Sequence, residues 1–242
     1  MVEVQAPKQE QLLEVVLNPR HRRVYDTHLQ RERRKVLGLV DDLERNRFTI
    51  FRSLTLLRQL ALAPALVDEA HAGVPSSKAD AFLELLHEVV AEGHRVLVFS
   101  QFTRFLRIVR DRLDAAGLRH VYLDGRTRDR QARIEEFRGG RAPVFLISLK
   151  AGGSGLDLTE ADYVFVLDPW WNPAVEAQAV DRAHRTGQDK TVMVYRLVAA
   201  GTIEEKVMAL QERKRDLFAR VLDDGGALSG ALTADDIRGL FS

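Results

Sequence analysis

The sequence contains no cysteine. This absence excludes disulfide bonds, cysteine-ligated zinc, iron–sulfur clusters and cysteine nucleophiles, and it fits a reducing compartment. Long apolar runs are also absent, since no stretch approaches the roughly 18 residues that span a bilayer. Residues 1–10 lack the apolar core of a secretory signal. We therefore expect a protein that is neither secreted nor embedded in a membrane.

Several catalytic patterns are missing as well. The sequence has no G-x-x-x-x-G-K-[ST] phosphate loop, no H-E-x-x-H and no G-x-S-x-G. Asp68-Glu-Ala-His71 spells the magnesium box of many nucleic-acid-stimulated ATPases, but there the box follows a buried strand. Here it follows Leu60–Pro64, a helix end broken by proline, so we interpret it as accidental. The residues alone give no complete catalytic set and no metal site.

The composition is that of a soluble globular protein. The chain has 242 residues, of which 45% are hydrophobic and 29% charged, which suggests one large domain or a domain with an appendage. The net charge is only +1. Between Arg20 and Lys35, however, seven basic residues stand against two acidic ones. This stretch either docks an acidic partner or is a solvated helix face.

Hydrophobic periodicity divides the chain into three parts. Residues 1–75 read as helical, with a stripe at Ile50, Leu54, Leu57 and Ala61, and no alternating strand pattern. Breakers at residues 72–77 mark a boundary. Residues 201–242 are helical again. We predict domains at 1–75 (a helical insertion), 76–200 (a sheet domain) and 201–242 (bracing helices).

The middle part alternates between strand and helix. Five short apolar runs read as buried strands: residues 95–100, 120–123, 143–148, 163–168 and 191–196. This alternation predicts an α/β fold with a mostly parallel sheet and helices on both faces. Ligands of such sheets bind at the carboxyl ends of the strands. The polar signatures of the chain fall at these ends.

The stretch Ser148–Asp157 is rich in glycine and follows a predicted strand. Glycines let backbone amides approach a phosphate, and a helix N-terminus favours negative charge. A glycine-rich turn can equally be a packing solution, and the residues alone leave both interpretations open.

A second segment, Asn172–Gln188, begins with a good helix cap followed by proline. In one helix, Gln178, Arg182 and Arg185 would share a face, because they stand at i, i+4 and i+7. Two arginines on one face can bind a phosphate bidentately. The alternative is an exposed polar face with ion pairs to Asp181 or Glu176.

Three motifs in this order carry a family resemblance. Ser148–Asp157, Asp168-Pro-Trp-Trp-Asn-Pro173 and Gln178–Gln188 together resemble the second motor lobe of Swi/Snf-type ATPases, in helicase superfamily two. Val96–Thr103, Leu123-Asp-Gly125 and the segment from Tyr195 to Glu205 fit the same pattern. The resemblance runs from roughly Ser77 to Val207, and Leu56–Leu60 resembles the helical insertion that precedes this lobe.

The resemblance implies a RecA-like lobe that completes an ATP site with a first lobe. That first lobe would supply the phosphate loop and bind most of the ATP and Mg²⁺. Arg182 and Arg185 would reach the terminal phosphate across the cleft, and Gln178 would hold their helix in register. Gly155 and Asp157 would lie near the nucleotide or couple it to DNA.

The resemblance also places double-stranded DNA against this lobe. The backbone contacts it implies involve Ser100, Gln101, Lys150, Ala151 and Gly152, with Arg126 or Arg130 adding a further one. Trp171 would lie beside the DNA groove, whereas we expect Trp170 to pack beneath the motif helix. Phosphate contacts carry no sequence information, so binding should be sequence-independent and sensitive to salt.

The sequence is thus expected to be the carboxyl-terminal half of an ATP-dependent translocase on double-stranded DNA, inactive as an ATPase by itself. Its partners would be DNA, the first motor lobe of the same protein and a DNA-bound protein substrate. It would act in the cytoplasm, at the nucleoid, of a prokaryote or in the nucleus of a eukaryote. The alternatives are a non-enzymatic binding module and a strand-separating helicase of the same superfamily.

Overall fold

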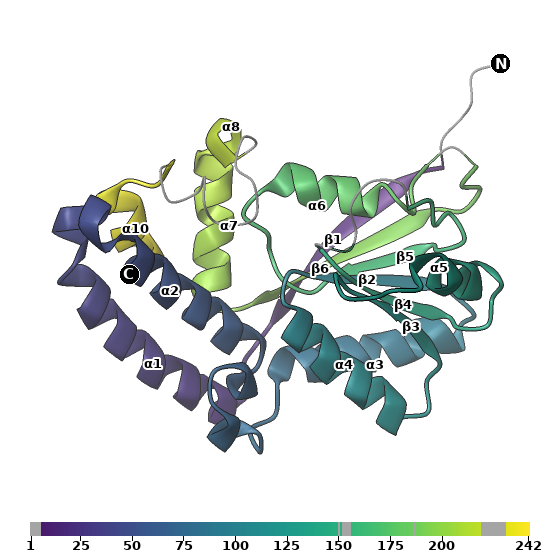
Figure 1. The fold of residues 1–242 in the computed structure, drawn as a ribbon, viewed down its shortest axis with the longest axis horizontal. Helices are drawn as coiled ribbons and strands as arrows, with labels where there is room; N and C mark the ends of the chain where they lie inside the picture. The colour runs from purple at the N-terminus through teal and green to yellow at the C-terminus, as the bar shows by residue number, and fades with distance from the viewer. Residues whose placement is uncertain (1–5, 150, 152–155, 186, 219–230) are drawn as a thin grey trace. The chain divides into compact units, whose positions relative to one another are not determined.

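The computed structural model describes residues 6–149, 151, 156–185, 187–218 and 231–242 (Figure 1). The chain forms two compact units. The sheet unit comprises Met1–Leu13, Ala81–Asp168 and Glu176–Leu197, and the helical unit comprises Glu14–Asp80, Pro169–Val175 and Val198–Ser242. Most of the two segments expected to be helical, at 1–75 and 201–242, therefore belongs to one unit. The domain boundaries at 75 and 200 stay predictions.

Six strands of the described ranges form one sheet: β1 (Lys8–Val15), β2 (Val96–Ser100), β3 (His120–Leu123), β4 (Val144–Ser148), β5 (Tyr163–Val166) and β6 (Val192–Ala199). Their order is β1-β6-β5-β2-β4-β3. The pairs β2–β4, β2–β5, β3–β4 and β5–β6 are parallel. Every residue of β2 and of β4 is buried, as expected of strands covered on both faces. The carboxyl ends of β2, β4 and β5 consequently meet at one edge.

Helices cover both faces of this sheet, as the sequence predicts. The helices α3 (Ser77–Ala91) and α4 (Thr103–Ala115) lie on one face, and α5 (Arg130–Arg138) and α6 (Pro173–Val180) lie on the other (Figure 1). Aromatic pairs contribute to the packing of these helices on the sheet. The rings of Phe82 and Phe165 lie 5.1 Å apart, and those of Phe137 and Phe145 lie 5.3 Å apart. Such pairs add to the area that the core buries.

Strand β1 was not predicted, because the first 75 residues were expected to be helical. Its sequence, Lys-Gln-Glu-Gln-Leu-Leu-Glu-Val, is mostly exposed and carries no apolar alternation. Backbone hydrogen bonds define the strand instead: Val192 N donates to Pro7 O (3.0 Å), and Ala200 N donates to Val15 O (2.8 Å). An edge strand that is held by its ladder leaves little hydrophobic signal in a sequence.

The helical unit packs α1 (Pro19–Leu37) and α2 (Leu43–Leu62) with α7 (Ile203–Arg213), α8 (Arg215–Phe218) and α10 (Ala234–Leu240). Short 3₁₀ turns lie at Val40–Asp42, Pro64–Leu66 and Glu69–His71. All four residues of the predicted α2 stripe are at most 1% exposed. This confirms the 3.6-residue period. In the segment 201–242, which is expected to be helical, α7 ends at Arg213 and α8 and α10 follow, while residues 219–230 lie outside the described residues.

Buried polar contacts hold the ends of these helices. Asn18 caps α1 by accepting from His21 N (2.8 Å), and its backbone N–H donates to Ser77 Oγ (2.7 Å). Lys78 forms an ion pair with Glu204, and both side chains are almost completely buried. Each polar group removed from water here has a partner, as burial requires. None of the helices in the described ranges is long and apolar enough to cross a bilayer.

Candidate functional site

The candidate site lies where β2, β4 and β5 end. The register pairs Ser100 with Ser148 at the last position of β2 and β4. Asp168 follows β5 and is 1% exposed. The Ser100 hydroxyl donates to one carboxylate oxygen of Asp168, and the Gln101 N–H donates to the other (3.2 Å). Asp168 therefore fixes the turn after β2.

This geometry changes how Ser100 can act. Its side chain is 0% exposed, and its oxygen accepts from the Phe102 N–H (3.0 Å) while its proton goes to Asp168. The hydroxyl thus organises the turn, and a ligand would meet the backbone of this turn or the partly exposed Gln101. The DNA contacts expected of Ser100 and Gln101 stay predictions.

The turn after β4 begins with a backbone hydrogen bond to the end of β2. The Leu149 N–H donates to Ser100 O (3.1 Å), and Ala151, 3% exposed, donates to Ser148 O (3.1 Å). Lys150, Gly152 and Gly155 lie outside the described residues. The backbone carbonyl of Asp157 accepts two hydrogen bonds from Arg138, at 3.2 and 2.5 Å. The nucleotide role expected of Asp157 stays a prediction.

The segment after β5 differs from the predicted helix. The helix α6 ends at Val180, and residues 181–185, which we call the arginine segment, form turns. The expectation that Gln178, Arg182 and Arg185 share one helical face is therefore wrong. Local turns follow the helix, with Arg182 N donating to Ala179 O (3.3 Å), and one tertiary hydrogen bond runs from Leu158 N to Arg182 O (3.0 Å).

Gln188 fixes the chain just after the arginine segment. It is the last residue of the family motif, and the sequence predicts no role for it. Its side-chain amide donates to the carbonyls of Thr159 (2.9 Å), Ala161 (2.8 Å) and Ala183 (3.0 Å), and the residue is 5% exposed. A glutamine that satisfies three backbone carbonyls leaves no trace in hydrophobic periodicity. Only its place in the family motif could have drawn attention to it.

The positive charges of Arg130 and Arg185 act on Arg182, and we call these three residues of the sheet unit the arginine cluster. Burial of the Arg182 guanidinium, together with the positive charges of Arg130 and Arg185, lowers the pKa of Arg182 to about 10. It stays protonated at neutral pH. Arg130 comes from the start of α5, whereas Arg185 is exposed. Arg130, which was expected to contact DNA, thus acts on Arg182, which was expected to contact ATP together with Arg185.

This convergence has a chemical meaning. Like charges held close together in a partly buried site destabilise one another, and an anion between them relieves the repulsion. Phosphate oxygens match guanidinium groups in charge and geometry. Gln178 is exposed on α6, so the packing of the sheet does not fix its side chain. The cluster is suited to a multiply charged phosphate.

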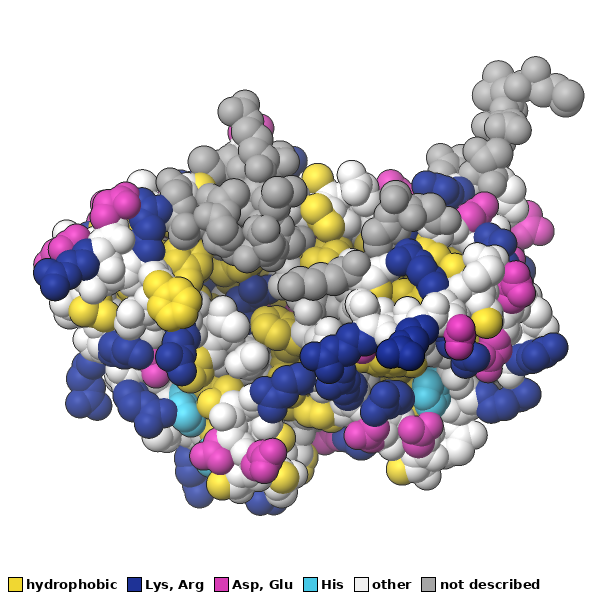
Figure 2. All heavy atoms as spheres, viewed as in Figure 1, with side chains coloured by type: hydrophobic (Ala, Val, Ile, Leu, Met, Phe, Trp, Pro, Cys, Tyr) yellow, Lys and Arg dark blue, Asp and Glu magenta, His cyan; other side chains and the backbone are white. Residues whose placement is uncertain are grey.

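A second basic element follows β3. Asp124 accepts from Arg126 N (2.8 Å) and from the Tyr122 hydroxyl (3.0 Å), so it shapes the turn and leaves the Arg126 side chain exposed. On this side of the sheet unit, Figure 2 shows dark blue Lys and Arg side chains gathered over α4 and the loops beside it. Arg104 of α4 and Arg128 of the loop are exposed as well.

The two tryptophans lie in the helical unit. Trp170 is 0% exposed and Trp171 is 5% exposed. The packing of Trp170 beneath the motif helix stays a prediction. The Arg58 guanidinium lies 4.9 Å from the centre of the Trp171 ring and donates to Pro169 O (3.1 Å). The carbonyls of both tryptophans accept from Gln211. A contact of the Trp171 ring with DNA stays a prediction, and it would require the ring to be uncovered.

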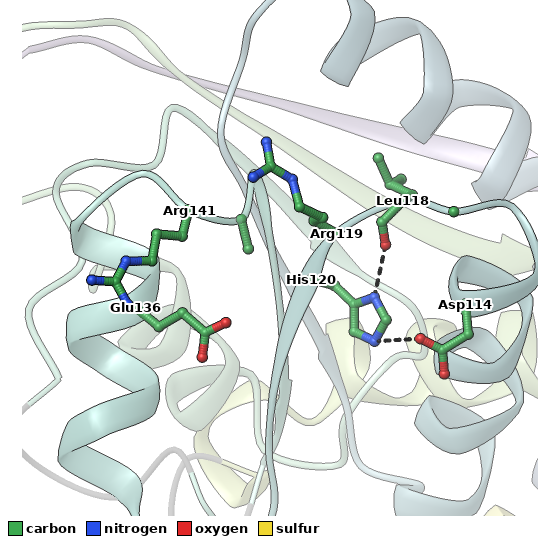
Figure 3. Close-up of a pocket in the computed structure, with 8 residues that line it drawn as sticks. Asp114, Leu118, Arg119, His120, Glu136 and Arg141 are labelled. Carbon is green, nitrogen blue, oxygen red and sulfur yellow. Dashed lines mark hydrogen bonds and ion pairs between the residues drawn. The ribbon is translucent and has the colours of Figure 1, made fainter.

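Two further features, the Asp68–His71 motif and a surface pocket, contain none of the residues predicted to bind ATP or DNA. Asp68 caps the 3₁₀ turn Glu69–His71 by accepting from Ala70 N (2.9 Å), with no buried strand before it, consistent with an accidental motif. A pocket at the amino-terminal edge of β3 and β4, opposite the candidate site, contains Asp114 and His120 (Figure 3). The His120 ring donates to Leu118 O (2.9 Å) and lies 3.4 Å from Asp114. No group of three metal-ligating side chains occurs within the described ranges.

Comparisons with known proteins agree with this geometry. The family described as "Helicase conserved C-terminal domain" matches residues 77–187. An "Uncharacterized ATP-dependent helicase" of Mycoplasma pneumoniae is 36% identical over 232 residues, covering 94% of this chain and 22% of that protein. "Protein CHROMATIN REMODELING 24" of Arabidopsis thaliana is 42% identical over 170 residues, covering 69% of this chain and 16% of that protein. The chain spans about a fifth of the length of these relatives.

Solved structures share the fold over nearly the whole chain. The "Sulfolobus solfataricus SWI2/SNF2 ATPase core in complex with dsDNA" matches with a TM-score of 0.77 and 27% identity, covering 96% of this chain and 50% of that one. The "C-terminal part of Fun30 ATPase domain" matches with a TM-score of 0.78 and 24% identity, covering 98% and 99%. The expected RecA-like fold is confirmed. Residues 77–187 are a helicase conserved C-terminal domain, and the chain is a homologue of the Snf2-family helicases.

Proposed function

We propose that this chain is the carboxyl-terminal lobe of an ATP-dependent translocase on double-stranded DNA and that it supplies arginines to an ATP site. The observation that carries the proposal is the arginine cluster, in which Arg182 is partly buried beside two like charges. The negative charge of a polyphosphate matches this concentration of positive charge.

The proposed chemistry is electrostatic. Arg182 and Arg185 would stabilise negative charge on the phosphoryl group that leaves ATP, and Gln178 would help to hold their position. Such arginines raise the rate by about 10³–10⁵ in other nucleotidases, which corresponds to roughly 4–7 kcal/mol. The first lobe of the same protein would hold most of the ATP and Mg²⁺. The 242-residue chain alone should therefore show no ATP turnover.

The proposed DNA surface is the backbone of the turns after β2 and β4, with Arg126 beside them and Arg130 shared with the arginine cluster. The solved relative in complex with double-stranded DNA supports this proposal. Lys150 and Gly152 would add contacts from outside the described residues. DNA held in this way is gripped by its phosphates, whatever its sequence.

The test is ATP hydrolysis by the parent protein, with and without duplex DNA, in the wild type and in Arg185→Ala. We expect DNA to stimulate the wild type, and we expect the folded, DNA-bound variant to lose turnover. Arg119→Ala, an exposed arginine in the pocket at the opposite edge of the sheet, is the matched control and should keep its rate. Full turnover by Arg185→Ala would mean that this lobe supplies no essential arginine at position 185. No DNA-stimulated hydrolysis by the wild type would favour the non-enzymatic binding module.

A further inference from the structure

The arginine segment is connected to a strand far away in sequence. The residues Ala6, Lys8 and Glu10, at the start of the chain, contact residues 176–196 at three places, and all of these residues belong to the sheet unit. We propose that β1 is a positioning element that holds the arginine segment in place for the ATP site. This inference rests on the proposed function and adds to it residues that no motif includes.

The contacts bracket Arg182 on both sides. Lys8 Nζ lies 3.7 Å from a carboxylate oxygen of Asp181, the residue before Arg182. The His184 ring donates from Nε2 to the carbonyl oxygen of Ala6 (2.5 Å), two residues after Arg182. One partner is a backbone carbonyl and the other a charged side chain. The short turn between them is therefore held at one end by Lys8 of β1 and at the other by Ala6, two residues before β1 begins.

Glu10 extends the connection to α6 through a shared arginine. The Arg196 guanidinium of β6 donates to Glu10 (2.7 Å) and, from Nε, to Glu176. Glu176 is 6% exposed and lies on α6, just ahead of the arginine segment. Lys8 closes the network at 3.3 Å from Glu10. Residues i and i+2 of a strand point to the same face, so Lys8 and Glu10 act together.

The charges in this network support one another. Burial would raise the pKa of Glu10, but hydrogen bonds and charge from Arg196 and Lys8 outweigh it and hold this pKa below its usual value. Burial would lower the pKa of Arg196, and Glu176 and Glu10 raise it instead. The Glu10 and Arg196 shifts both favour the charged forms, as expected of an ion pair with the 2.7 Å contact between them.

Stability alone does not account for this arrangement. The Lys8 and Glu10 side chains are 29% and 39% exposed, and ion pairs as exposed as these contribute little to folding. Position is more sensitive, because misplacing a catalytic group by ~1 Å can cost ~10²-fold in rate. Removing Glu10 or Lys8 should therefore leave a folded protein in which Arg182 and Arg185 reach the phosphate less often.

The experiment measures DNA-stimulated ATP turnover by the parent protein in Glu10→Gln and Lys8→Met. We expect kcat to fall about tenfold, with the melting temperature, the KM for ATP and the affinity for DNA nearly unchanged. Glu14→Gln, the same charge change at an exposed position of the same strand, should keep its kcat. The exchanged pair Lys8→Asp with Asp181→Lys should recover more turnover than Lys8→Asp alone.

A second readout does not depend on catalysis. In Glu10→Gln, amide hydrogen exchange should rise over residues 176–185 and stay unchanged over residues 96–100. Unchanged kcat and unchanged exchange in Glu10→Gln and Lys8→Met, with turnover abolished in Arg185→Ala, would overturn the positioning role alone. Full turnover in Arg185→Ala would instead overturn the proposed function, whatever Glu10→Gln shows.

Discussion

At the scale of single residues, the charge of Arg182 destabilises the fold, whereas the proposed ATP chemistry requires it. Burial and the charges of Arg130 and Arg185 lower the pKa of Arg182 to about 10, which means that the fold disfavours the charged form. The shift corresponds to at most about 3 kcal/mol, and solvent screening reduces this. Because Arg182 is charged at neutral pH, Arg182→Gln should stabilise the protein. We expect the melting temperature to rise by about 2–6 °C, while DNA-stimulated turnover is lost.

The same reasoning predicts how an anion acts. Inorganic triphosphate should raise the melting temperature of the wild type more than that of Arg182→Gln, because only the wild type gains from relieving the repulsion. Arg119→Gln, which removes an exposed arginine at the opposite edge of the sheet, is the control and should respond to triphosphate as the wild type does. A fall in melting temperature in Arg182→Gln without ligand would show that the Arg182 side chain is a structural contact.

How far single residues can be predicted depends on which interactions decide their roles. Arg182 and Arg185 stand in a local motif, so the sequence indicated them. The convergence of Arg130 on Arg182 links two segments about 50 residues apart, and no local pattern contains it. The burial of Ser100 and Trp171 is also non-local, because Asp168 and Arg58 determine what each side chain can touch.

At the scale of elements, the buried pair Lys78–Glu204 ties the first turn of α3 to α7. Glu204 also accepts from the Ala199 N–H (2.8 Å), which closes the turn between β6 and α7. Lys78→Met would leave a carboxylate buried without its cation, and breaking such a pair costs about 3–5 kcal/mol. We expect a corresponding loss of unfolding free energy, measured by urea denaturation.

A double variant separates the pair from the packing around it. In Lys78→Met with Glu204→Gln, the amide oxygen can still accept from Ala199, and no charge remains buried. This variant should recover most of the lost stability, because replacing both charges is often neutral. If the double variant is as unstable as the sum of its single changes, the ion pair contributes nothing beyond its two side chains.

Elements were predictable where burial shapes their sequence. Strands β2 to β6 and the stripe of α2 contain apolar residues at regular spacing, so the hydrophobic pattern of the sequence reveals them. Strand β1 is exposed and is defined by backbone pairing with β6, so it was read as helix. The helix expected to carry Gln178, Arg182 and Arg185 stops at Val180, and the amide of Gln188 donates to the carbonyl of Ala183 just beyond this end.

At the scale of the whole molecule, each unit draws on segments from different parts of the chain. The α/β class followed from alternating strands and helices, and the family followed from three motifs. The grouping of residues 14–80 with residues 198–242 could not be predicted, because contacts such as Tyr25 with Ile203 join positions almost the whole chain apart (2.7 Å). The network at Lys8 and Glu10 is non-local for the same reason.

The last prediction concerns the DNA surface as a whole. If the lobe grips phosphates, the logarithm of the DNA affinity of the parent protein should fall linearly with the logarithm of the salt concentration. Arg126→Ala removes one exposed cation beside the turns after β2 and β4. The magnitude of the slope should then fall by about 0.9, the value for one phosphate contact on duplex DNA.

The loss must be the same for every duplex, because a phosphate contact carries no base information. Fluorescence anisotropy with two unrelated duplexes, over a series of salt concentrations, measures both quantities. Arg119→Ala changes the same charge at the opposite edge of the sheet and should leave the slope unaltered. Equal slopes for Arg126→Ala and the wild type would remove Arg126 from the DNA surface. A loss confined to one duplex would mean that bases, and not the backbone alone, are read.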